Sequence, residues 1–411
     1  AGDDATAPSA ASGNDSGVTS GNSGSGGSDA SPGTPSSGSA GDASPPPSPS
    51  PDGSVVHALV HPGGWLTQAD LTRVRTQVAT NQAPWITAWN ALKSSDAGIG
   101  YTTHPPASDT NAYDIQRDGH AAWVLAIKWV ASGDPAYAKA SMGVIDAWTS
   151  TVTTVASEPL RNGVGSAQMA NAAEILAHGF NGAAGWPAAS IARAKTWFVN
   201  VVYVPHTKGG ASANWGTSAM IGNTSMAVFA DDVTMFNDAL DTYRHGFMPL
   251  SGGCCGVTQY IDATGEDAES GRDQGHSQGG IGHLLEVAQI AWNQGVDLVA
   301  YNDDYGVRTY GASGANRLLV GLEYTAQYNV GNTVAYHPFF EYCNNVTKYP
   351  AGISPAGRGN FSSQFWEMAN SLFTATGLPH PYTSQVLMQP GYAPEATSSD
   401  HPGLGTLLFR K

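Results

Sequence analysis

The densest group of side chains that could do chemistry lies between Glu269 and His283. The stretch reads Glu-Ser-Gly-Arg-Asp-Gln-Gly-His-Ser-Gln-Gly-Gly-Ile-Gly-His and contains carboxylates, a guanidinium, amides and two imidazoles. Its glycines would let backbone approach a ligand closely. Apolar residues at helical spacing follow directly. We therefore predict a polar, glycine-rich loop that leads into a helix and forms one rim of an active site.

The same stretch contains a match to the Gly-x-Ser-x-Gly elbow of serine hydrolases, centred on Ser277. That elbow requires a short buried strand of Val, Ile and Leu before the serine. Residues 265–274 are instead polar and glycine-rich, and the rest of the chain does not alternate strands with helices. We interpret the match as a chance one.

Two other chemistries are open to these residues. A metal site of His276, His283 and Glu286 matches no common zinc spacing, and we expect no metal ion or cofactor. An imidazole titrates near neutrality, so His276 suits a general acid or base. Arg272 and Gln274 could then hold an anionic or hydroxylated substrate. The alternative is a loop histidine that only hydrogen-bonds to backbone.

The elements that must position these groups are helices. Thr67 is a predicted N-cap, and Asp134 with Pro135 starts a later helix. Strand-like alternation is sparse, with residues 257–261 as the best candidate. Successive helix pairs predict an all-α fold, an α/α toroid or barrel of helix hairpins, with an irregular helical domain as the alternative that spacing does not exclude. The main predicted helices cover residues 113–132, 166–179, 188–204, 217–230, 232–246, 282–293, 313–329 and 360–376.

Residues 1–55 have a different composition from the rest. They contain no Lys, Arg or aromatic residue and are dominated by Gly, Ser, Ala, Pro, Asp and Thr. Such a segment buries too little apolar surface to offset its ordering entropy. We predict a disordered tether over residues 1–55 and one toroid domain over residues 56–411.

Charge and hydropathy exclude some partners. Six of the 33 acidic residues lie in the tether, which leaves 27 acidic against 18 basic residues and a net charge of −9 in residues 56–411. This balance disfavours nucleic acid as a partner. The chain has no run of about 18 apolar residues that could span a membrane.

The low-complexity start resembles a mature exported protein, so we expect a secreted, periplasmic or surface-tethered chain, with a lipid anchor before residue 1 as one option. A disulfide from Cys254 or Cys255 to Cys343 is a further option.

Five stretches, in order over about residues 60–380, resemble the alginate lyase superfamily. They include Ala-Asn-Trp-Gly-Thr-Ser at 213–218 and Glu-Ser-Gly-Arg-Asp-Gln-Gly-His at 269–276, with residues 121–140, 170–176 and 316–329 as the others. Together they are most similar to polysaccharide lyase family thirty-eight, whose members cleave alginate or β-1,4-glucuronan. The resemblance implies an α/α toroid with a substrate cleft across it.

The resemblance also implies β-elimination on an anionic 1,4-linked polyuronate, which leaves a 4,5-unsaturated uronate end. Asn214 and Arg317, with Arg272 as a second candidate, would neutralise the uronate carboxylate. His276 would remove the C5 proton and Tyr324 would protonate the leaving oxygen. Tyr328 lies one turn from Tyr324 and is an alternative acid. The better-known alginate lyases have a histidine after this asparagine, where the present chain has Trp215.

Further residues are expected to bind substrate. Trp215 and Trp366 could stack on sugar rings, and Gln116, Arg117 and His120 begin a helix whose family counterpart lies near the cleft. Two other functions remain open. One is a glycoside hydrolase on the same toroid that pairs Glu269 or Asp273 with Glu174 or Glu323. The other is a non-catalytic polysaccharide-binding protein at the cell surface.

Overall fold

The fold is that of a computed structural model, which describes residues 50–51, 55–108, 112–204, 211–247, 255–301, 316–341, 346–361 and 364–411. Nearly all of the predicted tether lies outside these ranges, and it stays a prediction. Residues 46–411 form one compact unit. No helix among the described residues is both long enough and apolar enough to cross a membrane.

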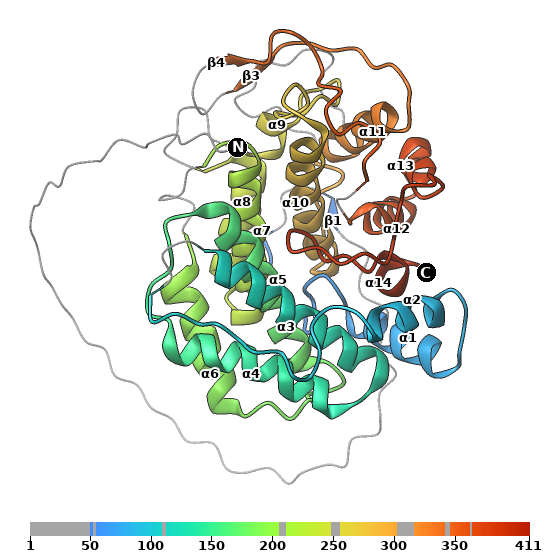
Figure 1. The fold of residues 1–411 in the computed structure, drawn as a ribbon. Coiled ribbons are helices and arrows are strands. Elements are labelled where there is room, and N and C mark those ends of the chain that lie inside the picture. The colour runs from blue at the N-terminus through green and yellow to red at the C-terminus, as the bar shows by residue number, and fades with distance from the viewer. Residues whose placement is uncertain are drawn as a thin grey trace, which may run out of the picture. The chain divides into compact units, whose positions relative to one another are not determined.

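Helices make up almost all of the regular structure (Figure 1). They are α1 (Gln68–Ala79), α2 (Trp85–Lys93), α3 (Tyr113–Ser132), α4 (Pro135–Thr151), α5 (Pro159–His178), α6 (Ala188–Trp197), the π-helix η1 (Phe198–Val202), α7 (Ala213–Ala230), α8 (Val233–His245), α9 (Val257–Tyr260), α10 (Gln274–Asn293), α11 (Arg317–Asn329), α12 (Trp366–Thr376), α13 (Pro381–Val386) and α14 (Gly405–Phe409). The strands that the structure describes form two small pairs. β1 (Ser50–Pro51) pairs in parallel with β2 (Val296–Asp297), and β3 (Phe339–Glu341) pairs antiparallel with β4 (Val346–Lys348).

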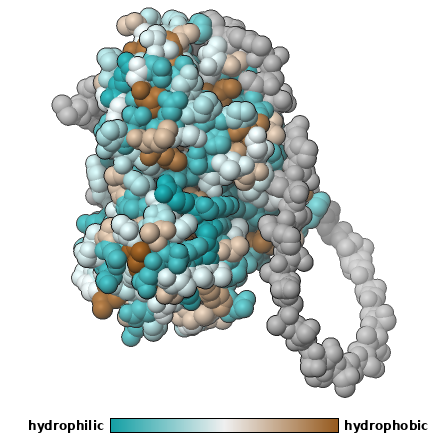
Figure 2. All heavy atoms as spheres, turned by 90° about the vertical axis from the view of Figure 1, so that its right-hand side faces the viewer, coloured by the Kyte–Doolittle hydropathy of each residue, from teal (hydrophilic) through white to brown (hydrophobic). Residues whose placement is uncertain are grey.

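The helices pack into a ring of hairpins. α3 packs on α5, α5 on α7 and α7 on α10, and then α12, α14 and α1 lead back to α3. Outside this inner series, α4 packs on α3, α8 on α7 and α11 on α10. This arrangement confirms the predicted all-α toroid. On the side toward α1, α12 and α13, a hydrophilic band crosses the middle of the surface (Figure 2).

The inner helices α3, α5, α7 and α10 run parallel to one another. Between α5 and α7, Gly163 lies against the Ser218 carbonyl and Asn171 donates to Ser225, so residue numbers rise together along both helices. The contacts between α3 and α5 and between α7 and α10 rise together in the same way. All four helices therefore begin at one end of the ring. Each helix start carries a partial positive charge, so this end favours anions.

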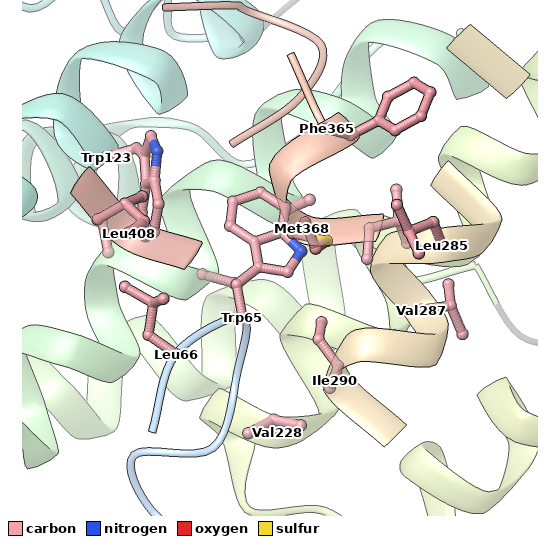
Figure 3. Packing of buried hydrophobic residues seen from close by; sticks show 14 of the residues in the cluster. Trp65, Leu66, Trp123, Val228, Leu285, Val287, Ile290, Phe365, Met368 and Leu408 are labelled. Carbon is pink, nitrogen blue, oxygen red and sulfur yellow. The ribbon is translucent and has the colours of Figure 1, made fainter. Parts of the chain in front are cut away.

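Buried apolar side chains from distant parts of the chain fill the space inside the ring (Figure 3). Each helix of the inner series contributes residues to it, because its inward-facing positions are apolar at helical spacing. The residues drawn include Trp65 and Leu66 ahead of α1, Trp123, Val228, Leu285, Val287, Ile290, Phe365, Met368 and Leu408.

Several predicted element boundaries agree with the structure. Thr67 forms a capping box with Asp70, and Asp134 caps α4 ahead of Pro135. The helix predicted over residues 113–132 has those bounds. Residues 257–260 form a helical turn, so the predicted strand there is wrong. The helix predicted over residues 313–329 begins at Arg317, and residues 313–315 lie outside the described residues.

The largest error concerns the start of α10. The glycines of residues 275–282 favour a loop locally, yet the helix begins at Gln274, eight residues before the predicted start. Asp273 caps it by accepting the amide of His276 at 2.9 Å. Gly280 must lack a side chain, because a Cβ there would lie 1.8 Å from the Tyr260 hydroxyl. Close packing thus requires small residues inside a regular helix.

Candidate active site

His276 lies in the first turn of α10 and forms a dyad with the residue that caps this helix. Its Nδ1 is 2.6 Å from Oδ2 of Asp273, while Oδ1 of the same carboxylate accepts the His276 amide. Burial opposes the charge of Asp273, but the hydrogen bonds and the charge of His276 outweigh burial and lower the pKa of this carboxyl. The His276 side chain is 38% exposed. The carboxylate orients the ring so that Nε2 can exchange a proton with a ligand.

Asn214 lies one helical turn from His276, across the α7–α10 contact. A Cβ on Gly280 would lie 3.3 Å from Cβ of Asn214, and Gly280 follows His276 by four residues on the same face of α10. Asn214 is the second residue of α7 and is 7% exposed. An amide donor and an orientable imidazole therefore meet where α7 and α10 begin.

Tyr260 is the third member of this group, and sequence reasoning missed it. Its hydroxyl occupies the space that the absent side chain of Gly280 leaves, next to Asn214. Among the described residues this buried hydroxyl has no hydrogen-bond partner. Burial, with the charges of Asp267 and Glu269, raises the pKa of Tyr260 well above its ordinary value. The phenol therefore keeps its proton at neutral pH.

Arg272 stands beside the dyad. Its Nη1 is 3.5 Å from Glu269 and its Nε is 3.9 Å from Asp273, and the side chain is 43% exposed. Burial raises the pKa of Glu269 although Arg272 and His276 oppose this. Arg272 is thus an accessible cation within the group that contains His276.

Ser277 is not a nucleophile in this structure. It lies inside α10, is buried, and donates its hydroxyl proton to Asp267 at 2.5 Å. Burial raises the pKa of Asp267 to about 6. No strand precedes the serine, because residues 274–293 are one helix.

Arg317 does not reach this group, which corrects the sequence prediction. Asn329 at the end of α11 donates to Gln274 at the start of α10, and Gly321 packs against Ile281, so the two helices are antiparallel. Arg317 is fully buried. The antiparallel packing places it beside a residue of α10 that lies about nine positions after the first turn, or about 13 Å along the helix axis. Its side chain leans farther away, toward the start of its own helix.

The hydroxyl of Tyr324 does not contact this group of residues, because it is held by a hydrogen bond to another segment. Its hydroxyl donates to the backbone carbonyl of Ala335 at 2.6 Å, and burial raises its pKa. The alternative acid, Tyr328, packs beneath the guanidinium of Arg358. Within the described ranges, no hydrogen bond joins either tyrosine to Asn214.

Two predicted substrate-binding residues are inaccessible. Gln274 is fully buried and uses its amide to bridge Ser270, Ser354 and Asn329. The Trp366 ring is fully buried and packs against Phe365, so no sugar can stack on it. Both residues support the framework rather than a ligand.

The other predicted binding residues lie at or near the surface. Trp215 is 42% exposed at the start of α7. Arg117 and His120 line a surface cavity together with Asp96 and Tyr101. Gln116 donates to Asp400 at 2.6 Å.

The segment that contains Asp400 crosses the middle of the ring. Trp123 of α3 donates to the Pro402 carbonyl at 2.7 Å, and Gln168 of α5 donates to the Ser398 carbonyl at 2.9 Å. His401 is buried and lies 2.6 Å from Glu286 of α10. Because it hydrogen-bonds to three inner helices, this segment ties them together within the ring.

Comparison with known proteins decides the family. The sequence profile of the Alginate lyase family matches residues 66–313, more than half of the chain. The chain belongs to the alginate lyase family. It is a polysaccharide lyase, as the resemblance of its motifs implies. A comparison with curated proteins gives no significant match.

Solved alginate lyases share the fold of this family member. Alginate lyase A1-III from Sphingomonas species A1 is 16% identical, with a TM-score of 0.55, over 86% of this chain and 98% of that one. A variant of alginate lyase A1-III in complex with a tetrasaccharide is 14% identical, with a TM-score of 0.58, over 86% and 97%. An alginate lyase from Bacteroides ovatus is 13% identical, with a TM-score of 0.53, over 85% and 99%.

The structure bears on two other sequence hypotheses. Among the described residues, the ligand atoms of His276, His283 and Glu286 do not gather within 4.8 Å of one another. Glu323, one acid of the hydrolase hypothesis, accepts the amides that begin α13. The disulfide from Cys254 or Cys255 to Cys343 stays a prediction, because Cys254 and Cys343 lie outside the described residues.

One further surface pair at the same end escaped the sequence analysis. Tyr113 begins α3 and is 56% exposed, and the guanidinium of Arg161 lies 3.9 Å from its ring centroid. Arg161 belongs to the first turn of α5. An exposed aromatic ring beside a cation suits an acidic sugar. Only the packing of α3 on α5 brings the two together.

Proposed function

We propose that this lyase cleaves a 1,4-linked polyuronate, alginate or glucuronan, by β-elimination at the end where α3, α5, α7 and α10 begin. The observation that carries the proposal is the His276–Asp273 dyad one turn from Asn214. A polyuronate carries one carboxylate per sugar. Four helix starts, the exposed guanidinium groups of Arg272 and Arg117 and the half-buried one of Arg161 offset that charge.

The reaction begins with the carboxylate on C5 of the sugar. Asn214 and Arg272 bind this carboxylate and stabilise the enolate-like intermediate, which makes the C5 proton more acidic. His276 removes that proton through Nε2, with Asp273 holding the ring. The electron pair of the broken C5–H bond becomes the C4–C5 double bond, and the C4–O bond to the neighbouring sugar breaks.

The leaving oxygen needs a proton, and Tyr260 is the donor that the arrangement favours. Its hydroxyl lies beside Asn214, and its raised pKa keeps it protonated. We assign this role to Tyr260 in place of Tyr324, whose hydroxyl is held by a backbone carbonyl. In this elimination His276 accepts the C5 proton as the base, and Tyr260 donates a proton to the leaving oxygen as the acid.

Neighbouring sugars bind along the same end. The exposed Trp215 stacks on one sugar ring, while Arg117, His120 and Gln116 contact sugars toward α3. We also propose that the lyase is exported, with residues 1–55 as a tether ahead of the catalytic domain.

The direct test is a panel of alginate, glucuronan and a neutral β-1,4-glucan, followed by the ultraviolet absorbance of the 4,5-unsaturated product. We expect absorbance to grow on at least one polyuronate and not on the neutral polymer. His276→Ala should abolish this growth, whereas Ser277→Ala should retain most of it.

Each competing function gives a different result in the same panel. Folded protein that forms no unsaturated product on any polyuronate refutes the proposal. New reducing ends without unsaturated product indicate a glycoside hydrolase. Polymer binding that is equal in the wild type and in His276→Ala, without turnover in either, indicates a binding protein.

A further inference from the structure

A second group of ionisable side chains lies at the opposite end of the inner helices. Glu174 and His178 occupy the last turns of α5, and Asp231 follows the end of α7. His61, from the segment ahead of α1, reaches both carboxylates. Glu174 is eleven residues beyond Gly163, which packs beside the start of α7 near Asn214. It therefore lies about 16 Å along α5 from that end.

The ligand atoms in this group face one another. One ligand atom from each of His61, Glu174 and His178 lies within 4.8 Å of the other two. Glu174 and His178 are four residues apart, so they share one face of α5. The rings of His61 and His178 stack with their centroids 4.3 Å apart. Three potential ligands thus converge from two separate parts of the chain.

Two of these atoms lack a hydrogen-bond partner. Oε2 of Glu174 and Nε2 of His178 are both buried and have no hydrogen-bond partner among the described residues. Water cannot easily serve as the partner of Glu174, because this residue is only 2% exposed. They are 3.7 Å apart, too far for a good hydrogen bond. Two ligands of one tetrahedral zinc ion stand about 3.4 Å apart, given zinc–ligand distances near 2.1 Å. An ion between them would satisfy both atoms.

The surrounding contacts resemble the outer shell of a metal site. Nε2 of His61 is 3.2 Å from Asp231, a carboxylate that can hold the ring with Nδ1 toward Glu174. Glu174 Oε1 also accepts the amide of Gly63 at 3.1 Å. Ligating histidines commonly donate their other nitrogen to a carboxylate, and ligating carboxylates are themselves hydrogen-bonded.

We propose that His61, Glu174 and His178 bind one zinc-like divalent cation, which fastens the segment ahead of α1 to the end of α5. Two imidazoles and one carboxylate are a ligand set that zinc accepts, with a fourth position for water. Mg²⁺ prefers oxygen ligands and should bind far more weakly.

Protons compete with the cation for these ligands. Burial opposes the charged form of His61, but Glu174 and Asp231 outweigh it and raise its pKa. Burial lowers the pKa of His178, and the charges of His61 and Lys195 act in the same direction. Because imidazole and carboxylate ligands must be deprotonated to bind a cation, the affinity should fall as the pH is lowered.

The test uses the full chain after treatment with a chelator and dialysis. We expect the protein to take up one Zn²⁺ per chain, by elemental analysis and titration calorimetry, and to melt at a higher temperature with Zn²⁺ than without it. Mg²⁺ should not raise the melting temperature. No stoichiometric uptake of Zn²⁺ by the wild type overturns the proposal, whatever the variants do.

Matched variants locate the ion. His178→Ala should weaken Zn²⁺ binding at least tenfold, and Asp231→Asn about 10- to 100-fold. The control is His245→Ala, because Asp241 and His245 have the same four-residue spacing and lie 2.6 Å apart on α8, away from the proposed site. Zn²⁺ affinity that is unchanged in His178→Ala, or reduced equally in the control, refutes the assignment.

Discussion

The dyad of His276 and Asp273 gives the sharpest test of the proposed chemistry. Asp273→Asn removes the negative charge but keeps an oxygen that can cap α10, since Asn is as good an N-cap as Asp. The fold should therefore persist, with the free energy of unfolding lowered by no more than about 1 kcal/mol. What changes is the partner of the imidazolium that forms when His276 takes the C5 proton.

The distance sets the size of the effect. Unit charges 2.6 Å apart attract by about 6 kcal/mol at an effective dielectric constant of 20, and by about 1.6 kcal/mol in bulk water. Both side chains are about a third exposed, so solvent screens the pair and the value lies toward the lower end. About 1.4 kcal/mol corresponds to a tenfold change in rate. We expect kcat to fall about 100-fold, within the range that a general base contributes.

The assay is the initial rate of unsaturated product formation on the preferred polyuronate, with circular dichroism to confirm folding. Asp241→Asn is the matched control, because Asp241 pairs with His245 at the same 2.6 Å in α8. A kcat for Asp273→Asn within twofold of the control would show that the carboxylate does not assist His276. The role of Asp273 would then be limited to capping the N-terminus of α10.

Three further outcomes follow from the site and its surroundings. Tyr260→Phe should lower kcat at least 100-fold while Tyr324→Phe stays within about threefold of the wild type; the reverse order would return the acid role to Tyr324. Trp215→Ala should raise KM about 3- to 10-fold with little change in kcat, because it removes stacking that substrate and transition state share; a fall in kcat alone would refute a stacking role. Burial raises the pKa of Glu266 to about 8, above about 4.3 in the unfolded chain, so the folded state retains a proton that the unfolded state releases. Stability should therefore fall as the pH rises from about 5 to 8, and Glu266→Gln should flatten this fall in melting temperature; an unchanged slope would contradict it.

Local signals account for the features that the sequence predicts correctly. Thr67 and Asp134 cap their helices because a short side-chain oxygen reaches the next turn, which depends only on neighbouring residues. The bounds of α3 follow from its apolar spacing and from Gly133, which ends it in the left-handed conformation.

The features that the sequence does not predict depend on packing between distant segments. Glycines cost a helix about 1 kcal/mol each in isolation, so residues 275–282 favour a loop by themselves. Tyr260 and Phe365 press against Gly280 and Gly282, where a side chain would collide with them. The same long-range contacts bury Trp366, whose aromatic character alone suggested a sugar platform.

Arg317 shows how a correct motif can still misplace a catalytic residue. Its seven-residue spacing from Tyr324 does place both residues on one helix face, as expected. The spacing does not fix the direction of that helix relative to α10. Because α11 is antiparallel to α10, its first residue lies far from the dyad, whereas α7 is parallel and delivers Asn214 at its start. The direction of a helix relative to α10 therefore decides which of its residues can lie in the site. This explains why the residues proposed to act on the sugar come from the beginnings of parallel helices, and why Arg272 rather than Arg317 is the cation beside His276.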